Sequence, residues 1–200
     1  MDSNKETKHL DLGSSNFPRN PYCSDHVFAV DIQDLPDELA PVNYHRCDFA
    51  LRPLPFPDSF FDFVSAYDVL EHIPRQLLQE SKGGLVYPFI NLMNEIHRVL
   101  RPNGKFLALT PGYPRAEAFQ DPTHVNIITI ETAKYFCGPV PPGGMYGFKG
   151  RFECISNEFD AHANHTSKDV PLLRQKLRKW HRKLFKGGLT HIVWELIAIK

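Results

Sequence analysis

The chain has 200 residues, of which 42% are hydrophobic and 23% charged, and its 23 acidic side chains balance 23 basic ones. This length and composition predict a single globular domain over residues 1–200 with a hydrophobic core of its own. The net charge near zero argues against bulk binding of nucleic acid, and four scattered cysteines argue against a disulfide framework.

The first half of the chain alternates short apolar runs with loops and one helix, which is typical of a mostly parallel sheet. Four runs predict strands at His9–Leu12, His26–Val30, Val42–Cys47 and Phe61–Tyr67. Pro88–Leu100 places its apolar residues at helical spacing and ends at a proline and glycine stop signal, Arg101 to Gly104. Lys105–Thr110 then predicts a fifth strand.

The second half of the chain is less regular. Gly138–Gly150 is rich in glycine and proline, which predicts a mobile loop without regular structure. Arg151–Phe159 and Thr190–Lys200 predict two late strands that pair antiparallel at the edge of the sheet. Between them, Leu172–Phe185 predicts a basic helix.

Polar residues and a glycine gather where the predicted strands end. In an open parallel sheet, ligands bind in the crevice beyond the carboxyl ends of the strands. Asp11 and Gly13 close the first strand, and Asp31 closes the second, where a carboxylate can accept both hydroxyls of a ribose. Asp48 follows the third strand, and Tyr67 and Asp68 close the fourth. The alternative for each carboxylate is an ordinary helix N-cap.

Four segments carry a family resemblance: HLDLGSS, FAVDI, LPFPDSFFDFVSAYDVLEHIP and EIHRVLRPNGKFLALTP. They resemble the class I S-adenosylmethionine-dependent methyltransferases, most of all the broad, type 11-like group that methylates small molecules, lipids and sugars. The resemblance covers about residues 8–136. It implies an α/β Rossmann-like fold, with a mostly parallel central sheet flanked by helices and a late antiparallel edge strand. It also implies S-adenosylmethionine as the cofactor.

The resemblance further implies a cofactor half over about residues 8–110, with acceptor-side loops and a tail over residues 111–200. The first motif wraps the methionine part of the cofactor, and the acid after the second strand binds the ribose. The acid of the third motif lies by the adenine, and the residue that ends the fourth strand lies beside the methionyl group. The residues implied for the methionine part are Asp11, Gly13 and Ser15, and those for the ribose are Asp31 and Ile32. Those for the adenine are Asp48 and Phe49, and Tyr67 is the residue beside the methionyl group.

One departure from the family pattern concerns the first motif. The family usually has three glycines there, whereas Ser15 and Phe17 stand at the second and third positions. Pro18 and Pro21 also leave little room for a long helix after the first strand. Two alternatives stay open: a catalytically inactive methyltransferase-like binding or regulatory module, and an NAD-dependent oxidoreductase. The oxidoreductase is disfavoured because the turn lacks the glycine pattern that cradles a pyrophosphate.

Methyl transfer to a hydroxyl needs a base for the hydroxyl proton, and histidine titrates in the required range. We expect His124, oriented by Asp121, to be that base, with His72 either structural or the base in its place. The phrase DPTHV resembles a segment of methyltransferases of bacterial polysaccharide and glycolipid pathways. This implies a hydroxyl of a sugar, glycolipid or polysaccharide precursor as the acceptor. The alternative is a surface turn capped by Asp121.

Two groups of side chains offer metal-ligand types, and we weigh both against the prediction of no metal. One would be a hard-ligand site and the other has a spacing compatible with zinc. The first group is His72, His124 and Asp121, and the second is Asp160, His162 and His165. Histidines are common in polar loops, so that neither group is preferred over the absence of a metal.

Residues 172–186 form a basic segment in which RQKLRKWHRKLFK carries seven lysines and arginines and no acid. Leu173, Leu177, Trp180 and Leu184 fall on one helical face. This face either packs on the sheet or makes a peripheral contact with an anionic membrane. The chain lacks an apolar signal segment and a run of membrane-spanning length, so we expect a cytoplasmic location. The sequence does not predict the oligomeric state.

Overall fold

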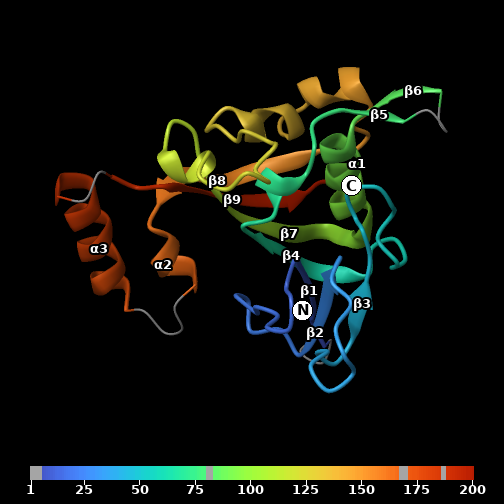
Figure 1. The fold of residues 1–200 in the computed structure, drawn as a ribbon, viewed down its shortest axis with the longest axis horizontal. Coiled ribbons are helices and arrows are strands. Elements are labelled where there is room, and N and C mark those ends of the chain that lie inside the picture. The colour runs from blue at the N-terminus through green and yellow to red at the C-terminus, as the bar shows by residue number, and fades with distance from the viewer. Residues whose placement is uncertain (1–5, 80–82, 167–170, 186–187) are drawn as a thin grey trace.

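A computed structural model describes residues 6–79, 83–166, 171–185 and 188–200 of the chain. At its centre lies a seven-stranded sheet with the strand order β3-β2-β1-β4-β7-β9-β8 (Figure 1). Its strands are β1 (Lys8–Leu12), β2 (His26–Asp31), β3 (Tyr44–Arg46), β4 (Phe61–Tyr67), β7 (Leu100–Pro111), β8 (Phe152–Asp160) and β9 (His191–Ala198).

The strands β3, β2, β1, β4 and β7 run parallel, whereas β9 pairs antiparallel with both β7 and β8. This topology confirms the predicted Rossmann-like α/β fold with a late antiparallel strand. Because β9 runs against its neighbours, its first residue, His191, lies opposite Pro111 at the carboxyl end of β7. The tail of the chain therefore returns to the edge of the sheet where ligands bind in such folds.

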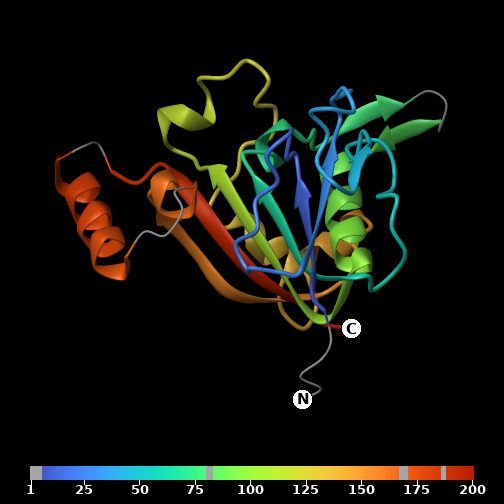
Figure 2. The ribbon, with the colours of Figure 1, turned by 90° about the horizontal axis from the view of Figure 1, so that it is seen from below.

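Helix α1 (Pro88–Val99) covers one face of the sheet (Figures 1 and 2). Its proline stands at the start, where the fixed φ suits a helix and the missing N–H costs no hydrogen bond. Phe89, Leu92, Met93 and Ile96 on its inner face are buried in the main hydrophobic core. The fully described connections from β1 to β2, from β2 to β3 and from β3 to β4 contain no α-helix.

Several predicted boundaries differ from the structure. The third strand is limited to Tyr44–Arg46, and β7 begins at Leu100, directly after α1, so the predicted stop signal lies within the strand. The hairpin of β5 (Leu77–Gln79) and β6 (Gly84–Val86) was not predicted, because three-residue strands carry no periodic pattern. The stretch Gly138–Gly150 contains a 3-10 helix, Pro142–Tyr146, which ends at a glycine with a positive φ.

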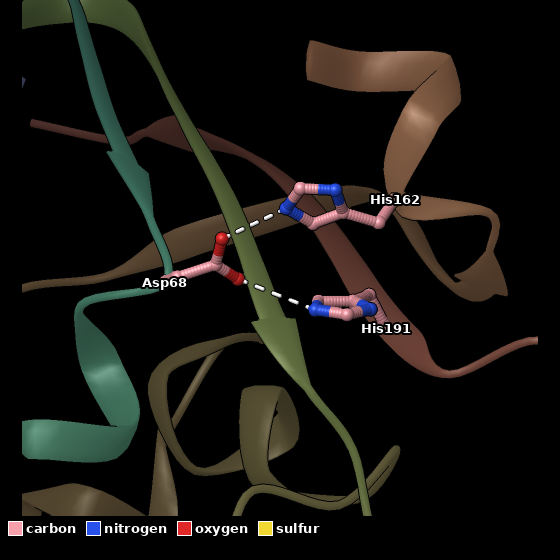
Figure 3. Close-up of side chains that lie close together, drawn as sticks. All are labelled: Asp68, His162 and His191. Carbon is pink, nitrogen blue, oxygen red and sulfur yellow. Dashed lines mark hydrogen bonds and ion pairs between the residues drawn. The ribbon is translucent and has the colours of Figure 1, made fainter. Parts of the chain in front are cut away.

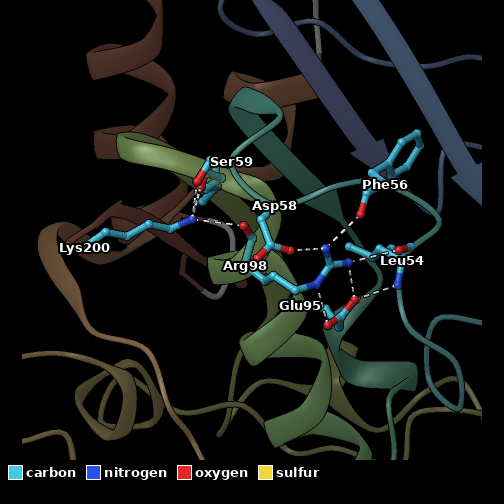
Figure 4. Close-up of polar contacts among 8 residues, drawn as sticks. Leu54, Phe56, Asp58, Ser59, Glu95, Arg98 and Lys200 are labelled. Carbon is cyan, nitrogen blue, oxygen red and sulfur yellow. Dashed lines mark hydrogen bonds and ion pairs between the residues drawn. The ribbon is translucent and has the colours of Figure 1, made fainter.

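The loop before β4 and the end of the chain are tied to α1 through Arg98 (Figure 4). Its guanidinium binds the carboxylates of Glu95 (2.7 Å) and Asp58 (2.8 Å) and donates to two backbone carbonyl oxygens of that loop. The Nζ of Lys200 donates to the carbonyl oxygen of Arg98 at 2.9 Å. These charge-assisted hydrogen bonds fix the loop between β3 and β4, which carries part of the candidate site.

Helices α2 (His162–Thr166) and α3 (Leu172–Phe185) lie at the end of the sheet away from β3 (Figures 1 and 2). Leu173, Leu177, Trp180 and Leu184 of α3 are each more than half exposed. The three leucines are therefore not buried against the sheet, whereas Trp180 lines a pocket together with Phe159 of β8. Residue 186, the last of the predicted basic segment, lies outside the described residues. Among the helices of the described residues, none has both the length and the apolar character of a membrane span.

Candidate active site

Gly13 forms the turn at the end of β1. Its φ is +67°, and its N–H donates to the carbonyl oxygen of Val30 at 2.8 Å. A Cβ at this position would lie 2.3 Å from Cγ2 of Val69. Only glycine therefore fits here, and the loop after β1 comes close to the loop after β4.

Ser15 and Asp31 join the loops after β1 and β2. The buried carboxylate of Asp31 accepts hydrogen bonds from the backbone N–H of Ser15 (2.8 Å) and of Gln33 (3.0 Å). Ser15, which stands where the family has its second glycine, has a φ of +49°. The serine thus keeps a left-handed turn, which the contact with Asp31 holds in place.

A cavity of about 390 Å³ opens at the carboxyl edge of the parallel strands. The loops after β1, β2, β3 and β4 all contribute to its wall. From the predicted cofactor-binding set, the structure brings together Gly13, Asp31, Ile32, Asp48 and Phe49 around this cavity. The loop after β4 adds Asp68, Val69, His72 and Ile73.

Of the predicted set, Ser15 is not among the residues that line this cavity, and neither are Asp11 and Tyr67. Asp11 is fully buried and accepts hydrogen bonds from the Ser65 hydroxyl (2.5 Å) and the backbone N–H of Arg19 (2.7 Å). Burial raises the pKa of Asp11 to about 6. The guanidinium of Arg19 lies over the ring of Tyr67, 4.5 Å from its centre. Both residues therefore hold the segment after β1 against the sheet.

His72 lines the cavity and is oriented by the loop after β7. Its Nδ1 lies 2.9 Å from the hydroxyl oxygen of Thr123, which donates to the carboxylate of Asp121 at 2.7 Å. A threonine hydroxyl has one proton and a carboxylate accepts only, so the Nδ1–H of His72 donates to Thr123. This tautomer leaves a lone pair on Nε2, the atom that can take a proton.

His124 packs behind His72, with the ring centres 4.8 Å apart. Its side chain is 9% exposed, and it is not among the residues that line the cavity. The carboxylate of Glu71 lies near it, with Oε1 4.0 Å from Nε2 of His124. The carboxylate of Asp121 accepts hydrogen bonds from the backbone N–H and the hydroxyl of Thr123. The potential metal ligands grouped here are Glu71, His72 and His124, without Asp121.

The histidines of the tail do not form the group of Asp160, His162 and His165 that was weighed against the absence of a metal. His165 pairs with Asp160 at 3.0 Å, whereas Nε2 of His162 lies 2.8 Å from Oδ2 of Asp68 (Figure 3). Nε2 of His191 lies 3.3 Å from the other oxygen of Asp68. Burial would raise the pKa of Asp68, but its contacts with the two histidines outweigh this and lower it. His191 was not among the predicted site residues. The sequence signal for it is its position at the start of the late strand that was predicted to pair antiparallel.

Comparison with known proteins identifies the family. The sequence of residues 10–108 matches the protein family described as a methyltransferase domain. No match to the chain is found among curated proteins. A methyltransferase of Haloferax volcanii, solved in complex with the Trm112 methyltransferase activator, shares 14% identity, covering 100% of this chain and 85% of that chain with a TM-score of 0.58.

Two further solved structures share the fold. A SAM dependent methyltransferase from Archaeoglobus fulgidus is 16% identical, covering 97% of this chain and 86% of that chain with a TM-score of 0.53. The 1,6-didemethyltoxoflavin-N1-methyltransferase of Burkholderia thailandensis, with bound 1,6-didemethyltoxoflavin and S-adenosylhomocysteine, is 15% identical, with coverages of 98% and 72% and a TM-score of 0.53.

The segment that matches the family contains all the loops that line the cavity. These loops follow the strands of a mostly parallel sheet, at the edge where nucleotide-like cofactors bind in such folds. Residues 10–108 therefore form a methyltransferase domain, and the chain has the fold of S-adenosylmethionine-dependent methyltransferases.

Proposed function

We propose that the chain transfers the methyl group of S-adenosylmethionine to a hydroxyl of a small molecule, namely a sugar, glycolipid or polysaccharide precursor. The observation that supports a hydroxyl acceptor is a single cavity that combines the predicted cofactor residues with His72. The Nε2 of His72 carries a lone pair and can remove a hydroxyl proton.

In this proposal, the carboxylate of Asp31 accepts the ribose hydroxyls, and that of Asp48 accepts the adenine amino group. Asp31 already accepts two backbone N–H groups. A carboxylate has about four lone-pair sites, so two remain for the ribose. Ile32 and Phe49 offer apolar surface to the adenine, and Gly13 lets the backbone approach the methionine part.

The proposed transfer is a direct displacement. The acceptor hydroxyl gives its proton to Nε2 of His72, its oxygen forms a bond with the methyl carbon, and the carbon–sulfur bond breaks to release S-adenosylhomocysteine. Holding the two reactants in line can contribute about 7–11 kcal/mol, and the base about a 100- to 10,000-fold rate increase. Asp121, acting through Thr123, stabilises the positively charged ring of His72. His124 supports the ring from behind.

Incubation with methyl-labelled S-adenosylmethionine and a panel of acceptors tests this function. The panel contains free sugars, nucleotide sugars, glycolipids and amines of similar size. We expect the label to appear on a hydroxyl, with loss of transfer in His72→Ala. Transfer to amines alone would contradict the hydroxyl acceptor. Binding of S-adenosylmethionine with no transfer to any acceptor would favour the inactive, regulatory module.

A second proposal concerns α3, which we infer docks on an anionic lipid surface. Arg178 and Lys179 face the protein, where they contact the carbonyl oxygen of Ala163 (2.7 Å) and the carboxylate of Glu158 (2.8 Å). The opposite face exposes Leu173 (71%) and Leu177 (56%). A helix with an exposed apolar stripe and basic residues is typical of interfacial membrane binding.

Sedimentation with vesicles at low salt tests the docking of α3. Arg174 and Lys176 flank the apolar stripe at helical spacing and are both exposed. We expect the wild-type chain to sediment with vesicles that contain phosphatidylserine, and Arg174→Glu with Lys176→Glu to abolish this. A matched control reverses two exposed lysines elsewhere, Lys134 and Lys149, and should sediment normally. A wild-type chain that never sediments would contradict the proposal.

A further inference from the structure

Asp68, His162 and His191 form a cluster beside the cofactor cavity (Figure 3). Their potential ligand atoms, one from each side chain, all lie within 4.8 Å of one another. The cluster is open on one side, because the side chains of Asp68 and His162 are 36% and 35% exposed. Asp68 itself lines the cavity, so that the cluster and the cofactor pocket share a wall.

The topology of the sheet brings these three residues together. Asp68 follows β4, and its backbone N–H donates to the carbonyl oxygen of Leu109 in the neighbouring strand β7. His191 begins the antiparallel strand β9, opposite Asp160 at the end of β8. His162 follows β8 by two residues. The cluster therefore lies at the carboxyl edge of the parallel strands, where the fold places its chemistry.

The details of the cluster suit metal ligation. Both histidines direct Nε2 toward the carboxylate of Asp68, at 2.8 Å and 3.3 Å. The other ring nitrogen of His191, Nδ1, lies 2.8 Å from the hydroxyl of Thr190. Such a second partner fixes the tautomer and orientation of a metal-ligating histidine. The buried Oδ1 of Asp68 has no hydrogen bond, although His191 stands near it.

We infer that Asp68, His162 and His191 bind a divalent transition-metal ion of the Zn²⁺ type at the acceptor end of the cofactor cavity. Two imidazoles and one carboxylate are ligands that zinc accepts, and three protein ligands leave a position for a further oxygen. Ligand atoms on a tetrahedral zinc ion lie about 3.3 Å apart, given metal–ligand bonds of about 2.0–2.1 Å. The distance between His191 and Asp68 already has this value.

The site specifies the acceptor more closely, and this part of the inference rests on the proposed function. The fourth position takes an oxygen of the acceptor, so the substrate class is an alcohol or diol that can ligate a metal. The metal ion lowers the pKa of the bound hydroxyl, as it does for bound water. The proton then passes to Nε2 of His72, the oxygen attacks the methyl carbon, and S-adenosylhomocysteine leaves.

Zinc binding by the whole chain tests the site without reference to activity. The chain is treated with a chelator, dialysed at pH 7.5 and titrated with Zn²⁺ by calorimetry, and with Co²⁺ by visible absorption. We expect one equivalent to bind per chain. His162→Ala and His191→Ala should each weaken binding by at least about tenfold. His165→Ala is the matched control, because His165 lies on the same short helix but pairs with Asp160.

Two results would overturn the inference. The first is a wild-type chain that binds no Zn²⁺ in these titrations. The second is zinc binding that persists in His162→Ala and His191→Ala, or that is lost in His124→Ala instead, which would move the metal to the cluster around Glu71. The Kd for S-adenosylmethionine, measured on the same samples, shows that each variant is folded.

A chain that binds the cofactor but no zinc would leave the proposed function standing, whereas zinc binding without cofactor binding would reject the function alone.

Discussion

The two sides of the proposed active site are built in different ways. On the cofactor side, Gly13, Asp31 and Asp48 each lie within two residues of the end of a parallel strand. On the acceptor side, His72 is oriented by Thr123 from the loop after β7, and Asp68 meets His162 from beyond β8. The first set depends on local strand–loop geometry, whereas the second depends on how distant segments pair.

This difference has consequences for how each side tolerates change. Ser15 replaces a family glycine, yet its turn is retained through one hydrogen bond with Asp31. The acceptor side instead relies on contacts between segments that are far apart in the chain. Each of these side chains is oriented by one or two such contacts. We therefore expect variants on the cofactor side to change mainly cofactor affinity, and variants on the acceptor side to change mainly turnover.

His72→Ala tests the acceptor side with the largest expected effect. Loss of a general base should lower kcat by about 100- to 10,000-fold, while the Kd for S-adenosylmethionine stays near the wild-type value. Steady-state kinetics over a pH series, with calorimetry for the cofactor, measure both.

Two variants sharpen this test of His72. Thr123→Val removes the hydroxyl that orients the ring and should lower kcat by a smaller factor, whereas Thr123→Ser keeps the hydroxyl and should restore the rate. His124→Ala should mainly reduce thermal stability. Normal turnover of His72→Ala across the pH range would contradict the assignment. A large loss of kcat in His124→Ala alone would move the role of base to that residue.

Glu71 precedes His72 on the acceptor side, and its titration gives a pH-dependent stability. Burial raises the pKa of Glu71 to about 7, and its carboxylate accepts a hydrogen bond from Thr110. The folded chain thus holds this proton more tightly than the unfolded chain, so the contribution of Glu71 is present at low pH and lost as the pH rises through about 7.

Replacement of Glu71 by glutamine removes this titration. The free energy of unfolding of the wild type, relative to that of Glu71→Gln, should fall by about 2–3 kcal/mol between pH 5 and pH 8. Urea denaturation at a series of pH values measures the difference. Glu117→Gln, on the 3-10 helix Ala116–Ala118, is the control and should show no such trend. A constant difference across the range would contradict the raised pKa.

Asp31→Ala tests the cofactor side. Loss of charge-assisted hydrogen bonds to the ribose should cost about 1.5–3 kcal/mol, which weakens cofactor binding by tens-fold or more. Asp34→Ala is the control, since Asp34 lies three residues on and pairs with Arg46 at 2.9 Å. Calorimetric titration compares the two. An unchanged Kd in a folded Asp31→Ala variant would mean that Asp31 serves only to hold Ser15 and Gln33.

The sequence predicts the parallel strands, α1 and the cofactor-side loops because these depend on short-range patterns. The sequence does not predict those site residues whose place depends on the direction of a side chain or on the pairing of distant segments. Tyr67 and Asp68 are neighbours, yet only Asp68 lines the cavity. Neighbouring side chains in a strand point to opposite faces of the sheet. The hydropathy pattern locates the end of a strand only to within one or two residues, so it cannot tell which of two neighbours faces the cavity. His191 reaches the site only through antiparallel pairing, which no local pattern specifies.

The central claim is that the cavity at the ends of β1, β2, β3 and β4 binds S-adenosylmethionine. Thermal unfolding with S-adenosylmethionine, S-adenosylhomocysteine or NAD tests it most directly. At about 100 times the Kd, a ligand stabilises the folded chain by about 2.7 kcal/mol, which raises the Tm of a domain of this size by about 5–10 °C. We predict this rise with the first two ligands and not with NAD, and its reduction to about half or less in Asp31→Ala at the same ligand concentration. A rise with NAD alone would contradict the account.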